Sequence, residues 1–191
     1  MTNTVGNVVA GRPKTAGGVY RAPLGSTLPT DSTTALDAAF VALGYAGDAG
    51  VTETNGRTTN TIQAWGTDIV KVVQTEFSVT YQVTLIESLG ANANKAAYGD
   101  SAVSSTAASS AHGNRLAVSV KAAPLDHNCW AFDMKDGDAS YRIVVPDGQM
   151  IAVGDITYSD GGVVAYPITI QAFPDSSGNN AYKYSDDGQT T

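Results

Sequence analysis

Apolar and polar side chains alternate with a period of two along residues 76–87. The apolar positions of this segment are Phe77, Val79, Tyr81, Val83 and Leu85, and the polar positions between them are Ser78, Thr80, Gln82 and Thr84. Successive side chains of a β-strand point to opposite faces of the sheet. The segment is therefore predicted to be a strand with one buried face and one hydrated, uncharged face.

The same period recurs elsewhere, interrupted by residues typical of turns. Strands are predicted over residues 115–121, 128–134, 139–145, 149–158 and 163–173, over 69–73, and as one or two short strands over 51–65. The turn signals are Asn55-Gly56, Asp136-Gly137, Pro146-Asp147-Gly148 and Asp160-Gly161-Gly162. Pro167 lies inside the last pattern, which favours an edge strand or a bulge there because proline cannot donate to a sheet ladder.

Two short helices are predicted in addition. The first begins near residues 30–32 and ends at Gly44, and its apolar side chains recur at helical spacing: Leu36, Phe40 and Leu43. The second covers residues 89–98, with Ser88 as its cap and Gly99 as its end. About eight strands and two helices, joined mostly by tight turns, predict a mainly β fold. The expected architecture is an antiparallel β-sandwich or barrel with a flanking short α-helix.

The two ends of the chain differ in composition from its middle. Residues 1–30 are rich in glycine and proline and contain three basic residues and no acid, so we interpret them as an N-terminal arm that contacts a neighbouring subunit. A frayed terminus is the alternative. Residues 31–173 form the predicted body, within which residues 100–113 form a mobile Ser/Ala-rich loop. Residues 174–191 form a polar, loose C-terminal tail.

Charge and composition exclude several classes of protein. The 191 residues include 18 acidic and 11 basic side chains, for a net charge of −7, which argues against a basic nucleic-acid binder. With a single cysteine no intramolecular disulfide can form. The N-terminus lacks the pattern of a secretory signal, and the longest apolar run, residues 38–43, is too short to span a bilayer. We expect a soluble protein made in a reducing cytosol.

The residues offer little that resembles a catalytic or metal site. His127 and Cys129 are two residues apart, but a buried cysteine near a surface histidine explains them better than a catalytic pair. Asp133, Asp136 and Asp138 faintly resemble a calcium loop, but its full ligand pattern is absent, which favours an acidic turn. No phosphate-binding, dinucleotide-binding, zinc-protease or serine-hydrolase motif occurs. No catalytic residue, metal or cofactor is predicted.

Several segments, taken in order, resemble a known protein family. They are residues 43–53 (LGYAGDAGVTE), 62–75 (IQAWGTDIVKVVQT), 77–85, 95–99 (KAAYG), 141–149 (YRIVVPDGQ), 153–158 (VGDITY) and 165–175 (AYPITIQAFPD). This order is similar to that of the major tail proteins, or tail tube proteins, of long-tailed bacteriophages, especially those that infect actinobacteria. The resemblance covers about half of the chain.

The resemblance implies a β-sandwich with a flanking helix, related to the type VI secretion tube protein. It implies hexameric rings that stack into a hollow tube, with strands of neighbours joined into a continuous inner barrel through which DNA passes without specific binding. The expected location is the tail of the virion, after assembly in the host cytoplasm. The expected partners are other copies of the chain, the tail terminator and the tail-tip and tape-measure proteins, with no membrane, no catalysis and no cofactor.

Candidate residues for these roles follow from the strand pattern and the charges. The residues predicted to face the lumen are Glu76, Ser78, Thr80, Gln82, Thr84, Glu87, Asp155 and Asp160. An acidic or uncharged wall would not hold phosphates, because it offers no counterion release. The acids can alternatively cap strand ends that face outside solvent. The residues predicted to contact other subunits or rings are Arg12, Lys14, Arg21, Arg57 and Trp65.

Three other functions remain open at this stage. A secretion-system tube protein or a minor tail component would share the same fold. A monomeric β-sandwich binding module would remain a small particle in solution. A β-rich enzyme would need a pair of carboxylates, and 18 acids offer many pairs.

Overall fold

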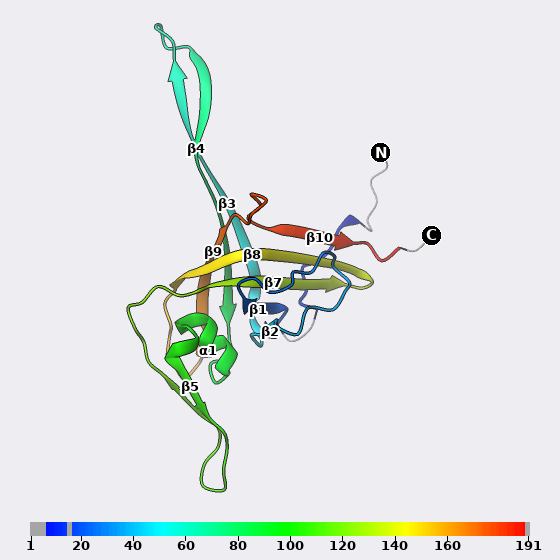
Figure 1. Cartoon of the computed structure of the whole chain (residues 1–191), viewed down its shortest axis with the longest axis vertical. Helices are drawn as coiled ribbons and strands as arrows, with labels where there is room; N and C mark the ends of the chain where they lie inside the picture. The colour runs from blue at the N-terminus through cyan, green and yellow to red at the C-terminus, as the bar shows by residue number, and fades with distance from the viewer. Residues whose placement is uncertain (1–6, 15–16, 190–191) are drawn as a thin grey trace.

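The computed structural model describes residues 7–14 and 17–189, and these residues form a mainly β structure (Figure 1). The elements, in chain order, are β1 (Val19–Pro23), β2 (Val41–Ala42), β3 (Ala46–Gln63), β4 (Ile69–Leu85), α1 (Ala91–Tyr98), the 3₁₀ turn η2 (Asp100–Ala102), β5 (Val103–Thr106), β6 (Arg115–Val118), β7 (His127–Asp136), β8 (Ala139–Val153), β9 (Tyr166–Phe173) and β10 (Tyr182–Asp186).

All strand pairs are antiparallel, and the main sheet runs in the order β2-β1-β7-β8-β9-β4-β3. Strand β8 is long enough to take part in both layers of the structure. Its first part lies between β7 and β10, and its second part pairs with β9 from Asp147 onward. The sheet therefore folds over on itself, and the predicted antiparallel β-sandwich is confirmed.

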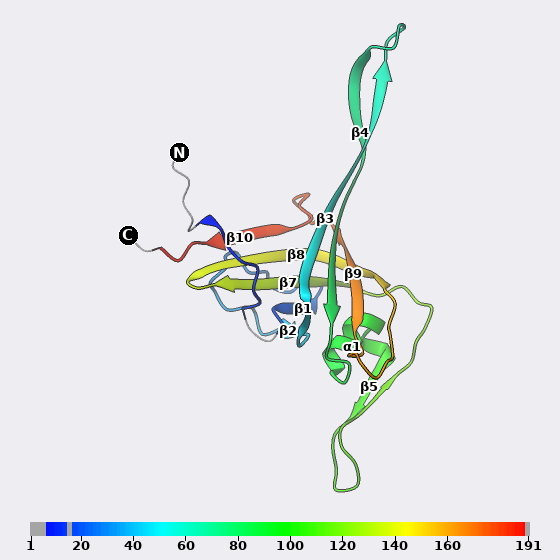
Figure 2. The ribbon, with the colours of Figure 1, turned by 180° about the vertical axis from the view of Figure 1, so that it is seen from behind.

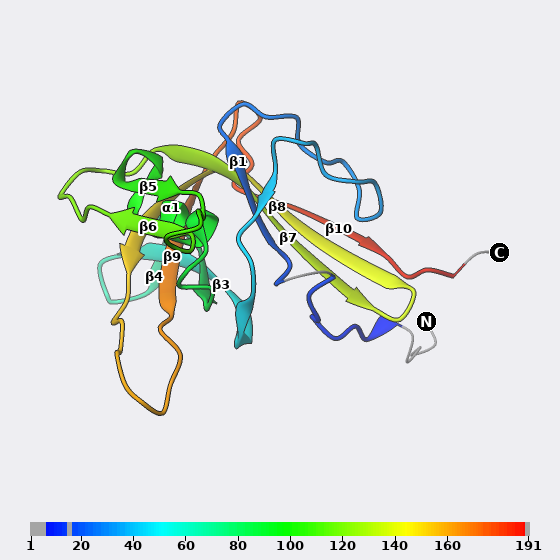
Figure 3. The same ribbon diagram turned by 90° about the horizontal axis from the view of Figure 1, so that it is seen from below.

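The core fills the space between the two layers. Tyr81 of β4 meets Phe132 of β7 with ring centroids 5.3 Å apart, so the layers pack face to face. Val79, Val83 and Leu85 point into the same cluster, as the period-two pattern predicts. Helix α1 contributes its alanines and closes one end, between the β5–β6 pair and β9 (Figure 3).

The predicted helix over residues 31–43 is wrong. This segment runs as bends and turns, and only Val41–Ala42 is regular, as strand β2. Its apolar side chains Leu36 and Phe40 pack instead on the outer face of β1 and β7, against Cys129 and Ala131. Within this covering segment, residues 31–43, the Asp31 carboxylate accepts hydrogen bonds from the backbone N–H groups of Thr33 and Thr34 at 2.8 and 2.6 Å.

Several predicted turns lie inside long strands. Asn55 and Gly56 are in the middle of β3, and the predicted strands 69–73 and 76–87 are one strand, β4. Residues 146–148 continue β8, because Trp130 packs on Gly148 and its Nε1 donates to the Gly148 carbonyl at 3.0 Å. Asp136-Gly137 forms the predicted hairpin turn between β7 and β8, and Asp160-Gly161-Gly162 lies in a turn of the loop that joins the antiparallel strands β8 and β9.

Other boundaries also differ from the predictions. Pro167 is not on an edge strand, since β9 lies between β8 and β4, and it is tolerated at the strand's second position. Helix α1 forms and ends at Gly99 as predicted, but its N-cap is Gly90 rather than Ser88. The predicted mobile loop 100–113 contains η2 and β5, and the predicted loose tail contains β10, which pairs with β8.

Two hairpins project from the body in opposite directions (Figures 1 and 2). The larger is the outer half of β3 and β4, which extends beyond the end of β9 and pairs only with itself. The smaller is the β5–β6 pair. Within the described residues no helix is long and apolar enough to cross a membrane.

Candidate functional site

The outward face of β3, β4 and β9 is a continuous surface of uncharged polar side chains. Cross-strand register places Thr54 beside Thr80 and Gln171, and Thr52 beside Gln82 and Thr169. The four predicted residues Ser78, Thr80, Gln82 and Thr84 all lie on this surface, which we call the polar face. Directly opposite residues of neighbouring strands point to the same side of a sheet, so the face follows from backbone register.

Sequence reasoning missed the part of the polar face that other strands contribute. Thr169 and Gln171 alternate with the buried Ile168, Ile170 and Ala172, so the period-two pattern of β9 carried the same signal as that of β4. Thr52 and Thr54 were hidden because the Asn55-Gly56 pair was interpreted as a turn.

The predicted lumen acids lie at different places around the polar face. Glu76 is exposed on β4 beyond the end of β9, and Thr58 donates to its carboxylate at 3.4 Å. Glu87 follows β4 and accepts a hydrogen bond from the backbone N–H of Tyr45 at 2.8 Å. Asp155 and Asp160 lie in the exposed loop between β8 and β9, because β8 ends at Val153 and not at residue 158 as predicted.

The sheet that carries the polar face has an unpaired edge on each side. Strand β3 is the last strand of the order, so its outer edge has no partner strand among the described residues. On the opposite side, β7 pairs with β8 only as far as Gln149. The edge of β8 from Met150 to Val153 borders a groove of about 450 Å³ that is also lined by Tyr98 and Leu125. Unpaired edges are sites where another strand can add.

The projecting hairpin carries two of the predicted contact residues. Trp65 lies at its tip and is fully exposed, with 107% relative accessibility. Arg57 stacks on Phe77 at 4.4 Å from the ring centroid and donates to Gln74 at 2.8 Å. Other apolar side chains of the hairpin are also exposed: Ile62, Ile69, Val70, Val72 and Val73. Such a patch on a water-soluble surface marks an interaction site.

The three basic residues of the arm that are predicted to contact a neighbour differ in burial and in the hydrogen bonds that they make. Arg21 lies in β1, is buried, and donates to Asp100 at 2.5 Å and to the Lys95 carbonyl at 3.3 Å. Lys14 donates to the Ser32 carbonyl at 3.4 Å. Arg12 has an exposed side chain. Arg21 and Lys14 thus make contacts within their own subunit, and a contact with a neighbour stays a prediction for all three.

The described residues bring together neither of the two chemical sites considered from the sequence. Cys129 is buried and donates to the Pro146 carbonyl at 3.1 Å, whereas His127 contacts Asp147 at 2.5 Å. Burial raises the pKa of the Cys129 thiol, which disfavours the nucleophilic thiolate. Asp133 is held by Arg142, and no group of three metal-ligating side chains occurs in the described part of the chain.

The chain matches the model of a known protein family. A family model described as phage tail tube protein matches residues 2–190. A cryo-EM structure of the anti-feeding prophage cap (AFP tube terminating cap) is 7% identical and covers 97% of this chain and 100% of that chain, with a TM-score of 0.46. A TM-score at this level supports no inference about this chain. No curated protein sequence matches.

Proposed function

Since this chain belongs to the phage tail tube protein family, we propose that six copies close into a ring and that rings stack into the tube through which DNA leaves the virion. Membership of the family gives the coarser role, that of a structural protein of the phage tail. The observation that carries the finer proposal is the polar face, which has an unpaired strand edge on each side.

Strand direction supports lateral joining of subunits through these two edges. Strands β8, β9, β4 and β3 alternate in direction, so β3 runs opposite to β8. When β3 of one copy lies beside β8 of the next, the two strands are antiparallel and extend one sheet across the boundary. A closed ring of copies leaves the sheet that carries the polar face without a free edge, which prevents non-specific strand addition there.

The chemistry of the polar face suits the wall of a DNA channel. Its hydroxyl and amide side chains are hydrated and carry no positive charge. DNA gains affinity chiefly where lysine and arginine replace its counterions, so this wall gives the phosphates nothing to bind. Glu76, Asp155 and Asp160 lie beyond the ends of the face and would add repulsion at the mouths of each ring.

Contacts between rings fall to the projecting hairpin in this proposal. Its outer part extends past every other strand of the subunit (Figure 2). Its apolar side chains are exposed and have no cover within the described chain. The tail terminator and the tail-tip and tape-measure proteins would meet the same surfaces at the two ends of the tube. Assembly would take place in the host cytoplasm.

Negative-stain electron microscopy of the purified protein tests the proposal. The wild-type chain should form rings or tubes as its concentration rises. Ile151→Lys places a charge at the β8 edge, where the native side chain is 53% exposed, and should abolish them. Val163→Lys is the matched control, since Val163 is 68% exposed in the β8–β9 loop, and it should assemble like the wild type. A monomeric wild type at every concentration, or tubes from Ile151→Lys, contradicts the proposal.

A further inference from the structure

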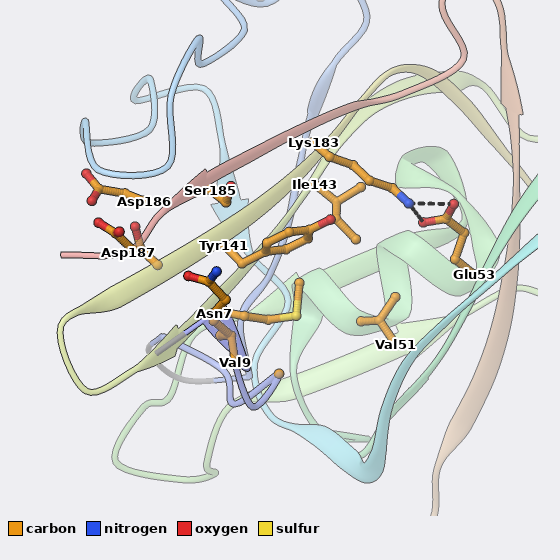
Figure 4. A pocket seen from close by; sticks show the side chains of 13 residues that line it. Asn7, Val9, Val51, Glu53, Tyr141, Ile143, Lys183, Ser185, Asp186 and Asp187 are labelled. Carbon is orange, nitrogen blue, oxygen red and sulfur yellow. Dashed lines mark hydrogen bonds and ion pairs between the residues drawn. The ribbon is translucent and has the colours of Figure 1, made fainter. Parts of the chain in front are cut away.

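A groove of about 620 Å³ opens between β10, the first part of β8, β3 and the residues around Val9 (Figure 4). Val51 and Ile143 face this space from the two layers of the sandwich, together with Tyr141 and Met134. All four also pack against the core. Among the residues that the structure describes nothing covers this side of the core, so the groove is an open side of the core rather than a pit on a polar surface.

The rim of the groove is charged, and only some of its charged side chains form ion pairs within the described chain. At one end Lys183 of β10 pairs with Glu53 of β3 at 2.7 Å, which ties the two strands together. At the other end lie Asp186 and Asp187 (Figure 4). Among the residues that the structure describes, neither of these carboxylates takes part in an ion pair. An occupant should combine an apolar group with a cation.

The projecting hairpin presents both an exposed apolar side chain and a cation. Trp65 is the largest exposed apolar side chain, and Ile62, three residues before it, pairs directly with the exposed Lys71. Trp65 itself lies in the turn after β3, which ends at Gln63. Lys183 and Asp186 are three residues apart along β10, which separates the two ends of the groove by about 10 Å.

We propose that Trp65 of one copy docks in this groove of a copy in the adjacent ring, with Lys71 facing Asp186. The proposal rests on the proposed function and names the contact that would join successive rings. The hairpin is paired along its length and extends away from its own body, so Trp65 reaches a groove only on a second copy (Figure 1). A buried tryptophan at the centre of a contact is typical of the residues that dominate binding.

Tryptophan fluorescence reports the docking directly. The chain has two tryptophans, and Trp130 is buried with 1% exposure, so acrylamide should quench mainly Trp65 in the monomer. In wild-type tubes this quenching should disappear. Trp65→Ser should raise the concentration needed for assembly at least about tenfold. Leu89→Ser removes another exposed apolar side chain, 92% accessible and outside the hairpin, and should leave that concentration unchanged.

Two further sets of variants locate the receiving site. Gly11→Leu fills the groove, where a new Cβ meets only the flexible Met134 side chain at 3.3 Å, and should impair assembly as Trp65→Ser does. Gly113→Leu adds the same group in open space and should not. Lys71→Glu should impair assembly, and the added change Asp186→Lys should restore it. Thermal unfolding of each monomer checks that the variants fold.

The outcomes separate the docking from the function on which it rests. Wild-type tubes in which acrylamide still quenches Trp65 would overturn the docking alone. So would normal assembly of Gly11→Leu, or a charge exchange without rescue. A wild type that forms neither rings nor tubes would overturn the proposed function, and the docking with it.

Discussion

Replacement of Arg142 by leucine removes the charge that holds residues 31–34, the beginning of the covering segment, to the sandwich. The Arg142 side chain is 1% exposed, and its Nε and Nη2 donate to the two carboxylate oxygens of Asp133 at 2.5 and 2.8 Å. Its Nη1 donates to the backbone carbonyls of Asp31 and Thr34, both at 2.9 Å. One guanidinium therefore satisfies a buried carboxylate and fixes a segment that has no regular structure of its own.

The expected loss of stability comes from the groups that lose their hydrogen-bond donor in the leucine variant, which are the Asp133 carboxylate and two backbone carbonyls. Removing one partner of a buried ion pair costs about 3–5 kcal/mol, because the other charge stays buried without compensation. The two carbonyls lose their donor, and an unsatisfied buried group costs about 1–3 kcal/mol. Water can reach part of the opened segment, so we expect a total of about 4–6 kcal/mol. This is a large share of the roughly 5–15 kcal/mol that stabilises a domain.

Urea unfolding of the monomer, followed by fluorescence, measures this loss. Arg142→Leu, Asp133→Leu and the double variant form a double-mutant cycle, and the double variant should be destabilised by at least about 2 kcal/mol less than the sum of the single variants. The same cycle on the partly exposed pair Lys183 and Glu53, whose side chains are 45% and 17% exposed, should give a smaller coupling of about 0–1 kcal/mol. A coupling below about 0.5 kcal/mol at Arg142 and Asp133 would refute the reasoning.

Two further predictions concern the fold. Gly148→Ala places a Cβ 2.7 Å from the Trp130 ring, which is buried and unable to move aside, so thermal unfolding should show a loss of about 1–3 kcal/mol; Gly161→Ala, in open space, should be neutral, and an equal loss there would contradict the explanation. Hydrogen bonds from the Thr34 hydroxyl and from neighbouring backbone amides hold the pKa of Asp31 at about 2, below its ordinary 3.8. A depressed pKa contributes stability above about pH 4 that is lost as the pH falls toward 2. Asp31→Asn should therefore flatten the acid-unfolding curve in that window, whereas an unchanged slope would exclude this contribution.

The sequence predicts correctly those parts of the fold whose conformation depends on residues that are close to one another along the chain. The period-two pattern of residues 76–87 gives the buried face of β4, and Gly99 ends α1 as predicted. The failures are positions where a distant residue decides the conformation. Gly148 continues a strand because Trp130 covers it.

The covering segment shows the same limit in a different way. Leu36 and Phe40 have helical spacing, but their burial comes from contact with Cys129 and Ala131 on β7, which a local pattern does not reveal. Of the candidate site, the uncharged polar residues of β4 could be predicted. The partners that complete the face, such as Gln171, required the strand order.

In the exposed hairpin the sequence pattern no longer predicts which side chains are buried within a single chain. Apolar residues continue along β4 into the hairpin, although β-bulges interrupt its register with β3 there, and β9 accompanies β4 only from Val79 onward. Before that residue, Phe77, Val72 and Ile69 continue the line of the core-facing side chains without a second layer to cover them. An isolated two-stranded hairpin is marginally stable in water, so apolar residues at these positions stabilise it only when another molecule supplies the missing layer. The apolar residues thus indicate that this surface is buried, but not which molecule buries it. In a tube protein a neighbouring copy is the molecule best placed to cover it.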